Sequence, residues 1–393
     1  MFYICLNFIN YGDVSLDKII YLDNSSTTKP CQGAVREINR CLTENWGNPS
    51  SLHLMGFAAE TEMTNARIAV SKVLHCREDE IFFTSGGTEA NNIAILGAVS
   101  AGKRRGNRIV TTAIEHPSVL NVFEKLKNDG IEVVYLHPDE NGTIPESELE
   151  SAINKDTILV SMMLVNNEVG SVLPVEKISA IIKKVGSPAL IHCDAVQGFG
   201  KMPIDVKKLG VQLLTLSGHK IHGPKGVGVL FKAKGVNLKE SVFGGGQEKG
   251  LRSGTEGVPA ICGLLGAVND LHDITKSLAY ITELNSYSRS VLTGTGLVKI
   301  NSPENALPYI LNISVSGYKS ETLLHFLESK NIFVSSGSAC SKGVKSYVLR
   351  EMGINDKEID SSLRISFCKN NTKEEIDILA NELKNAAKIL KRA

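Results

Sequence analysis

The sequence has little that would assign it to a specialised class of protein. No apolar run approaches the length needed to cross a bilayer, which argues against a membrane protein. The 43 basic and 42 acidic residues leave a net charge of +1, so charge favours binding to neither nucleic acid nor a membrane surface. None of the eight cysteines forms a C-x-x-C pair. Such scattered thiols predict a reducing, cytoplasmic compartment and argue against a disulfide framework or a zinc ribbon.

The first 20 residues lack the features of a targeting segment. They are largely apolar, but they have no basic flank and no small-residue cleavage site, which argues against a signal peptide. We therefore treat residues 1–20 as an N-terminal extension of unassigned role. The chain as a whole is 42% hydrophobic and 22% charged, which is ordinary for a globular protein, and its length predicts two to three domains.

The stretch 213–230 contains the first candidate functional residue, Lys220. An apolar run predicts a buried strand, and Lys220 follows it just before a turn rich in glycine and proline. Asp194 lies close after a second apolar strand, at 189–191. An amine and an acid at two strand ends fit pyridoxal phosphate, which needs a lysine for its aldehyde and a carboxylate for its ring nitrogen. Taken alone, each would more often be a solvated surface charge.

A glycine turn between a strand and a helix offers a site for phosphate. Residues 81–84 predict the strand, and Gly87 and Thr88 open a helix that runs to about residue 101. Free backbone N–H groups and the positive end of the helix would face the anion, and the Thr88 hydroxyl adds a donor. The simpler alternative is a helix N-cap after a glycine-rich turn.

Two further polar residues follow predicted strands. His116 lies where the strand at 108–112 gives way to a helix, and its imidazole could stack on a flat ring, although a lone histidine is more often structural. Asn167 follows the buried strand at 158–165 and either contacts a ring oxygen or substrate, or only shapes a turn.

The alternation of strands and helices predicts an α/β fold with a mainly parallel sheet and helices on both faces. In such sheets the ligand binds beyond the carboxyl ends of the strands, and the polar clusters described above all fall there. We predict a large domain over residues 21–258, whose first segment packs on the second domain, and a smaller α+β domain over residues 259–393.

The second predicted domain carries a thiol on a loop of small residues. Cys340 lies within SSGSACSKG, a segment that costs little free energy to rearrange. Free cysteines usually pack in cores, so this loop favours a nucleophile, provided that its pKa is lowered. Arg364 lies inside a predicted strand, where its guanidinium needs a carboxylate from the protein or from a substrate. The glycine-rich loop at 243–256 is either a surface loop or a source of further phosphate donors.

These motifs, in this order, resemble the cysteine desulfurases of the NifS and IscS type, a branch of the class V aminotransferases. The matching stretches are YLDNSSTT, GNPSS, FTSGGTEANN, AIEHPSVL, NNEVG, HCDAVQ, SGHKIHGPKG, GGGQEKGLRSGTE, SSGSACS and LRISF. They extend from about residue 20 to residue 370, so chance agreement is negligible. The resemblance implies a pyridoxal-phosphate-dependent transferase of fold type I, with a large seven-stranded sheet and a smaller C-terminal α+β domain.

The resemblance implies a role for each residue of the cluster. Lys220 would form the Schiff base and move the proton at Cα, Cys340 would accept the sulfur, and His116 would stack on the ring and complete the catalytic set. Arg364 would bind the substrate carboxylate, with Asn167 beside it. The cofactor-binding residues that it implies are Gly87, Thr88, Asn167, Asp194, Gln197, Ser217, His219, Lys220 and, from a partner subunit, Thr255.

The implied reaction converts L-cysteine into L-alanine and moves sulfane sulfur onto Cys340 as a persulfide. The implied partners are sulfur-acceptor proteins, either an iron–sulfur scaffold or a tRNA thiolation enzyme, and a second copy of the chain in a homodimer. Direct binding to nucleic acid or membrane is not expected. We expect no metal site, with Cys340 as the one candidate for a transient iron–sulfur ligand.

Three features depart from the family pattern, and three alternatives stay open. Ser26 replaces the usual alanine, the segment after Cys340 is shorter than usual, and residues 367–369 replace a Gly-Arg segment.

A selenocysteine lyase, or another class V aminotransferase, would need no thiol on a mobile loop. A phosphate-loop nucleotide-binding protein is disfavoured because neither GGGQEKG nor GPKG has the required G-x-x-x-x-G-K-[ST] spacing. A non-catalytic scaffold would bind no cofactor.

Overall fold

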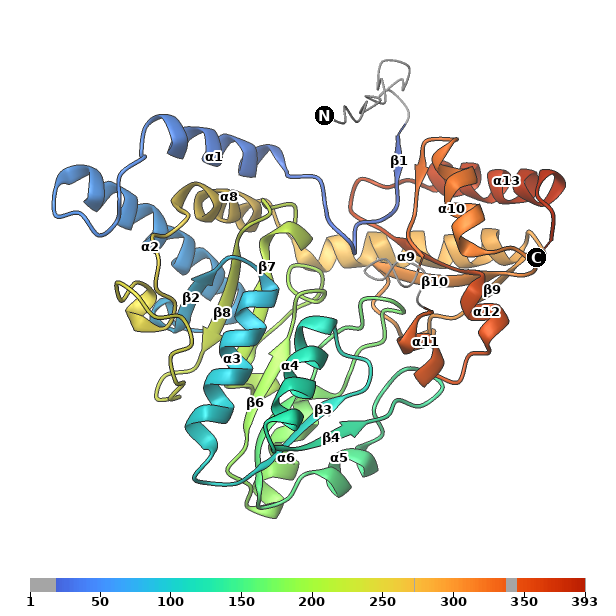
Figure 1. Ribbon diagram of the computed structural model, residues 1–393. Helices are drawn as coiled ribbons and strands as arrows, with labels where there is room; N and C mark the ends of the chain where they lie inside the picture. The colour runs from blue at the N-terminus through green and yellow to red at the C-terminus, as the bar shows by residue number, and fades with distance from the viewer. Residues whose placement is uncertain (1–18, 272, 337–344, 393) are drawn as a thin grey trace, which may run out of the picture.

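A computed structural model of the chain describes residues 19–271, 273–336 and 345–392. Residues 1–18 of the N-terminal extension and Cys340 lie outside the described residues. The large domain is built on seven strands: β2 (Ile81–Thr84), β3 (Arg108–Thr112), β4 (Glu132–Leu136), β5 (Thr157–Ser161), β6 (Leu190–Asp194), β7 (Leu213–Ser217) and β8 (Gly228–Lys232). Their order is β2-β8-β7-β6-β5-β3-β4 (Figure 1). Only the pairings of β8 are antiparallel, which confirms the predicted mainly parallel sheet.

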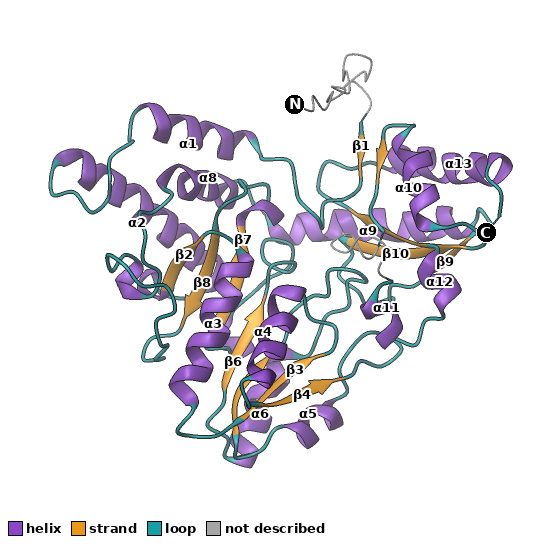
Figure 2. Cartoon of the chain, viewed as in Figure 1, coloured by secondary structure: helices purple, strands orange, loops and turns teal. Residues whose placement is uncertain are grey.

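Helices cover both faces of this sheet (Figure 2). Neighbouring residues on one strand face two different apolar cores, as Leu213 and Leu214 do on β7, so the strands are continuous apolar runs. One face carries α3 (Gly87–Gly102) and α4 (Pro117–Asn128), while the other core includes residues of α1 (Gln32–Thr43), α2 (Leu54–Leu74), α5 (Glu146–Ala152), α6 (Val175–Val185), α7 (Val206–Leu209) and α8 (Val258–Asn269).

The small domain joins the two ends of the chain. Its antiparallel sheet has the order β12-β10-β9, from β9 (Val298–Ile300), β10 (Ile310–Val315) and β12 (Ser362–Ser366). Its helices are α9 (Ile274–Thr293), α10 (Ser320–Glu328), α11 (Tyr347–Glu351), α12 (Asp356–Asp360) and α13 (Lys373–Ile389). The first described strand, β1 (Ile20–Tyr21), pairs in parallel with β11 (Ile332–Phe333) and so lies beside the small domain. Within the described ranges no helix is both long and apolar enough to cross a membrane.

After the expected domain boundary at 258/259, the helical pattern of the sequence predicts one long helix over about residues 260–293, and the structure differs from this prediction. The segment forms two helices, because Asp273 caps a new helix by accepting hydrogen bonds from the backbone N–H groups of Thr275 and Lys276. The first of the two, α8, packs on α1, where a Cβ atom added to Gly266 would lie 2.5 Å from the carbonyl oxygen of Gly33. This close approach fixes α8 against α1, and the next helix, α9, packs on α13.

Glu115 connects the end of β3 to the segment after β5 by hydrogen bonds, at the carboxyl ends of these strands. Its Oε1 accepts hydrogen bonds from the Thr112 hydroxyl and from the backbone N–H of Met163, each at 2.8 Å. Its Oε2 is buried and has no hydrogen-bond partner in the described part of the chain. Burial raises the pKa of Glu115 to about 8. The next residue, His116, is the N-cap of α4, so this neutral acid supports the point from which His116 projects.

The substitution Glu115→Gln should change how stability depends on pH. Because the folded-state pKa of Glu115 lies above its ordinary value of 4.5, the stability that Glu115 contributes is complete below that value and is lost as the pH rises to about 8. The wild type should therefore lose roughly 1 kcal/mol per pH unit relative to the variant across this window. Urea unfolding of both proteins at mildly acidic and mildly alkaline pH measures the difference, and equal losses in the two would contradict the buried neutral acid.

Candidate active site

The polar ends of the strands meet in one cavity of about 320 Å³. The predicted site residues that line it are Gly87, Thr88, His116, Asn167, Asp194, Gln197, Ser217, His219, Lys220 and Arg364. Thr255 is exposed on the loop before α8 and does not line this cavity. Cys340 lies outside the described residues. Segments far apart in the sequence therefore supply a single site, as the convergence of parallel strand ends requires.

One end of the cavity is shaped to receive an anion. The helix α3 begins at Gly87, and a Cβ atom added there would lie 2.9 Å from a methyl carbon of Val196, so only glycine lets the helix start come this close. Thr88 and Ser217 add hydroxyl donors beside the free N–H groups of the first turn. Burial, followed by the charge of Lys220, lowers the pKa of His219 to about 4, so this imidazole is neutral and can donate only one hydrogen bond.

The carboxylate of Asp194 is held in a fixed orientation at the end of β6. Its Oδ2 accepts a hydrogen bond from the Asn91 amide at 2.8 Å, and its Oδ1 accepts one from the backbone N–H of Val196 at 3.0 Å. Asn91 also donates to the hydroxyl of Ser118 at 2.9 Å. The carboxylate is thus preorganised to pair with a cationic N–H group inside the cavity.

His116 caps α4 and lines the cavity with a neutral ring. Its Nδ1 accepts a hydrogen bond from the backbone N–H of Ser118 at 3.1 Å, which assigns the ring proton to Nε2. Burial lowers the pKa of His116, against the opposing charge of Asp194. A neutral, half-buried imidazole is suited to stacking against a flat ring.

Lys220 ends a short 3-10 helix (Gly218–Lys220) that follows β7. Its Nζ donates hydrogen bonds to the carbonyl oxygens of Ser25 and Ser26, at 2.6 and 2.7 Å. The amide of Gln197 donates to the same Ser25 oxygen at 2.9 Å. The segment after β1 therefore forms one wall of the site through its backbone, a role that residue types alone did not reveal.

Arg364 projects from β12 with a side chain that is only 5% exposed. Its Nη1 donates to the carbonyl oxygen of Asn167 and its Nη2 to Asp23 Oδ1, both at 2.9 Å. Arg364 Nε and Asn167 Oδ1 are among the buried polar atoms that have no hydrogen-bond partner in the described part of the chain. Such orphaned atoms in a cavity wall indicate groups that await a ligand.

Sequence reasoning missed a second buried acid in the wall. Glu168 accepts a hydrogen bond from the hydroxyl of Ser346, which caps α11. Burial raises the pKa of Glu168 to about 7, against the opposing effects of that hydrogen bond and of the Arg364 charge. The motif NNEVG contains this acid, but a single acid within a turn motif gives no signal of burial.

The residues present fit pyridoxal phosphate, the cofactor that the resemblance implies. The cavity has an anion-binding end at Gly87, a fixed carboxylate at Asp194 and an amine at Lys220 between domains, all in one enclosed space. The orphaned Asn167 Oδ1 is a buried acceptor of this structure that the hydroxyl group of such a ring could satisfy by donating a hydrogen bond.

Comparisons with known proteins agree with this geometry. The chain is similar to the "Cysteine desulfurase IscS" of Methanosarcina thermophila, with 40% identity over 369 residues that cover 92% of this chain and 90% of the relative. It is also similar to the solved structure of a "NifS-like protein", with 37% identity, a TM-score of 0.90 and coverage of 95% of this chain and 100% of that one. A third similarity is to "SspA in complex with cysteine", with 32% identity, a TM-score of 0.79 and coverage of 90% and 100%. A model of the family "Aminotransferase class-V" matches residues 20–379, so the chain belongs to the class V aminotransferase family, in the branch of its cysteine desulfurases.

Proposed function

We propose that the chain converts L-cysteine into L-alanine with Lys220 as the cofactor's lysine and Cys340 as the first sulfur acceptor. The observation that carries this proposal is the single cavity in which Lys220, Asp194 and His116 surround the anion-binding turn at Gly87. When bound, pyridoxal phosphate links to an amine and draws electrons away from the Cα atom of the amino acid. In this cavity Asp194 would hold its ring nitrogen, His116 would cover its ring, and Gln197 and Asn167 would contact its ring hydroxyl.

The carbonyl oxygens of Ser25 and Ser26 are placed to accept hydrogen bonds from Lys220 once it has taken up the proton. Lys220 takes the proton from the substrate Cα as a free amine and thereby becomes an ammonium group. Both carbonyl oxygens already lie within hydrogen-bond distance of its Nζ, at 2.6 and 2.7 Å. They would stabilise the charged form of Lys220 after it has accepted the proton.

Arg364 would fix the substrate by its carboxylate. The guanidinium is buried and its orientation is set by Asn167 and Asp23, so little side-chain entropy is lost when a carboxylate binds. A substrate carboxylate would approach the Nε atom, which has no hydrogen-bond partner in the described part of the protein. This contact would orient the thiol of cysteine within the cavity.

The sulfur step would use the Cys340 thiolate as a nucleophile. Its sulfur attacks the sulfur of the substrate, the Cβ–S bond breaks, and the electron pair of that bond stays with the carbon skeleton, which takes up a proton and leaves as alanine. Cys340 then carries a persulfide for an acceptor protein in the cytoplasm, either an iron–sulfur scaffold or a tRNA thiolation enzyme. The second candidate, a selenocysteine lyase, would not need this thiol.

Exposed apolar side chains support a homodimer. They lie on and between α1 and α2: Leu42, Trp46, Leu52, Leu54 and Phe57. An apolar patch of this kind on a soluble protein marks an interface. The loop that carries Thr255 is anchored to the same helix α2 by the ion pair of Arg67 with Glu248, whose side chain is 1% exposed. This anchoring supports the proposal that Thr255 reaches the phosphate of a partner's site.

The substitution Cys340→Ser tests the reaction. The variant should bind pyridoxal phosphate with the visible absorbance of the wild type, while alanine release from cysteine falls by about a hundredfold or more, because the serine hydroxyl is a far weaker nucleophile. Chromatography of alanine and mass spectrometry of the Cys340 peptide, one sulfur atom heavier in the wild type, give the readout. The control is Cys76→Ser, which should retain full activity. A Cys340→Ser variant that still releases alanine and sulfide at the wild-type rate would favour the lyase.

The substitution Phe57→Glu tests the dimer. Phe57 on α2 is 71% exposed in the single chain, and a buried unpaired carboxylate at its position should weaken association at least tenfold. Light scattering after gel filtration over a range of concentrations measures the effect. The matched control is Ile389→Glu on α13, where the isoleucine is 70% exposed, and this change should leave the dimer intact. If both variants remain dimeric at low concentration, the interface lies elsewhere.

A further inference from the structure

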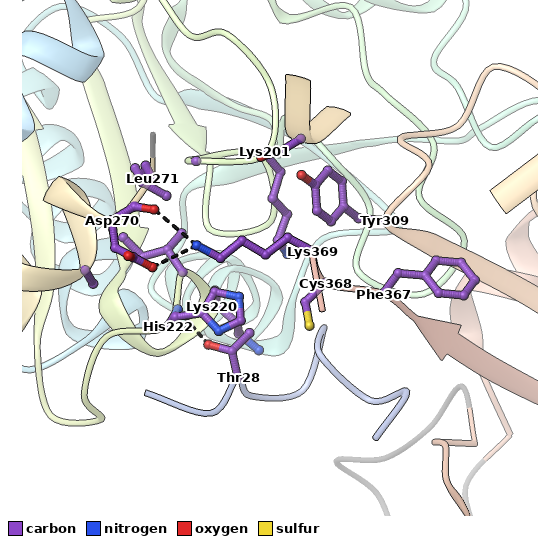
Figure 3. Close-up of a pocket in the computed structure, with 14 residues that line it drawn as sticks. Thr28, Lys201, Lys220, His222, Asp270, Leu271, Tyr309, Phe367, Cys368 and Lys369 are labelled. Carbon is purple, nitrogen blue, oxygen red and sulfur yellow. Dashed lines mark hydrogen bonds and ion pairs between the residues drawn. The ribbon is translucent and has the colours of Figure 1, made fainter. Parts of the chain in front are cut away.

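A second cavity, of about 40 Å³, is also lined by Lys220 (Figure 3). Its walls come from both domains, with Lys201 and Leu271 on one side and Tyr309 and Cys368 on the other. Lys201 is only 6% exposed, an unusual degree of burial for a lysine. It was not among the residues that the sequence singled out, and the reaction as described above gives it no task.

A chain of hydrogen bonds connects Lys201 to Lys220. Lys201 Nζ donates to Gln197 Oε1 at 3.0 Å. Gln197 Nε2 donates to the carbonyl oxygen of Ser25 at 2.9 Å, and the same oxygen accepts a hydrogen bond from Lys220 Nζ. The amines of Lys201 and Lys220 therefore lie at the two ends of one short hydrogen-bond network. Because Lys201 donates to the amide oxygen of Gln197, the amide nitrogen of Gln197 faces the carbonyl oxygen of Ser25.

The groups around the small cavity offer the charge of Lys201 no unengaged carboxylate, and its Nζ instead lies 5.9 Å from the centroid of the Tyr309 ring. The carboxylate in its wall, Asp270, is bound by Lys369 at 2.8 Å, as the dashed lines in Figure 3 show. Burial raises the pKa of Tyr309 to about 12 and also raises that of Cys368, while it lowers the pKa of His222. All three side chains are therefore neutral near neutral pH. No ion pair with a carboxylate is found for Lys201 among the described residues.

The groups on the side of the large cavity also offer Lys201 no unengaged negative charge. Asp23 is engaged by Arg364, and Asp194 is held by an amide and a backbone N–H at the other wall. His116 and His219 are neutral, because burial lowers the pKa of each. The positive charge of Arg364 further disfavours a second ammonium group nearby.

We propose that Lys201 is a positioning residue that shares one proton with Lys220, so that the two amines are not protonated together and one of them remains a free base. The inference rests on the proposed role of Lys220, which must be a free amine to take a proton from Cα. Two like charges in one enclosed site disfavour each other, and such groups titrate as a pair. In agreement, burial and then the charge of Lys220 lower the pKa of Lys201 to about 7.

Two substitutions at Lys201 test the proposal in opposite directions. Lys201→Met removes the competing ammonium group, so the pKa of Lys220 should rise by about one unit, whereas Lys201→Arg fixes a positive charge and should lower that pKa or leave it unchanged. The readout is trace acetylation of the apoprotein across a pH series, with mass spectrometry of the peptide that contains Lys220. Lys276, whose side chain is 87% exposed, serves as the internal standard of reactivity.

The control is Lys232→Met. Lys232 is another lysine whose pKa burial lowers, but it pairs with Leu213 at the opposite end of β7 from Lys220, so its loss should not move the pKa of Lys220. Identical pKa values of Lys220 in the wild type and both Lys201 variants would overturn the proposal. A shift in the same direction in both would also overturn it, because that result assigns Lys201 a structural role alone. Since no cysteine enters the assay, a failure of the proposed desulfurase reaction would leave this result unchanged.

Discussion

The geometry of the site depends on the segment that follows β1, residues 23–26, because this segment is hydrogen-bonded on both of its sides. On one side it is bound to β12, where Arg364 pairs with Asp23 and the backbone N–H of Ser25 donates to the Ser366 hydroxyl at 2.8 Å. On the other side its carbonyl oxygens accept hydrogen bonds from Lys220 and Gln197. Because the large sheet supplies the amine and the small domain supplies the guanidinium, this segment sets the distance between them. A rigid connection of this kind is what a reaction at one substrate carbon requires.

Burial shifts the pKa of several groups in and near the site toward neutral pH. The pKa of Glu115 is raised to about 8 and that of Glu168 to about 7, while that of Lys201 is lowered to about 7, and in each case burial is the first cause. Of these, Glu168 lines the large cavity and Lys201 the small one, and all three groups therefore change protonation close to neutral pH. Perturbed groups cluster in this way where a protein moves protons, and the low local polarity strengthens the few charges that remain, such as that of Arg364.

The sequence predicted the strands and the polar clusters well, because each buried strand is a continuous apolar run that ends at a motif, as at Lys220 and Asp194. It could not predict contacts made by backbone atoms, since any residue at Ser25 or Ser26 would offer the same carbonyl oxygen. Asn91 was not singled out because its partner Asp194 is 103 positions away. Lys201 resembled a surface lysine, because burial is a property of the packed fold and not of a residue type. The sequence did not predict the break between α8 and α9, because that break depends on a single N-cap residue, Asp273.

The parallel pairing of β1 with β11 has a consequence for how the protein is made. Residues 20 and 21 find their partners at 332 and 333, so the first described strand must wait until most of the chain has left the ribosome. The strands of the large sheet pair over shorter separations, the longest being that between Ile81 and Phe231, and can assemble meanwhile. The segment after β1 is therefore fixed in the site only after the strands of the large sheet have been synthesised.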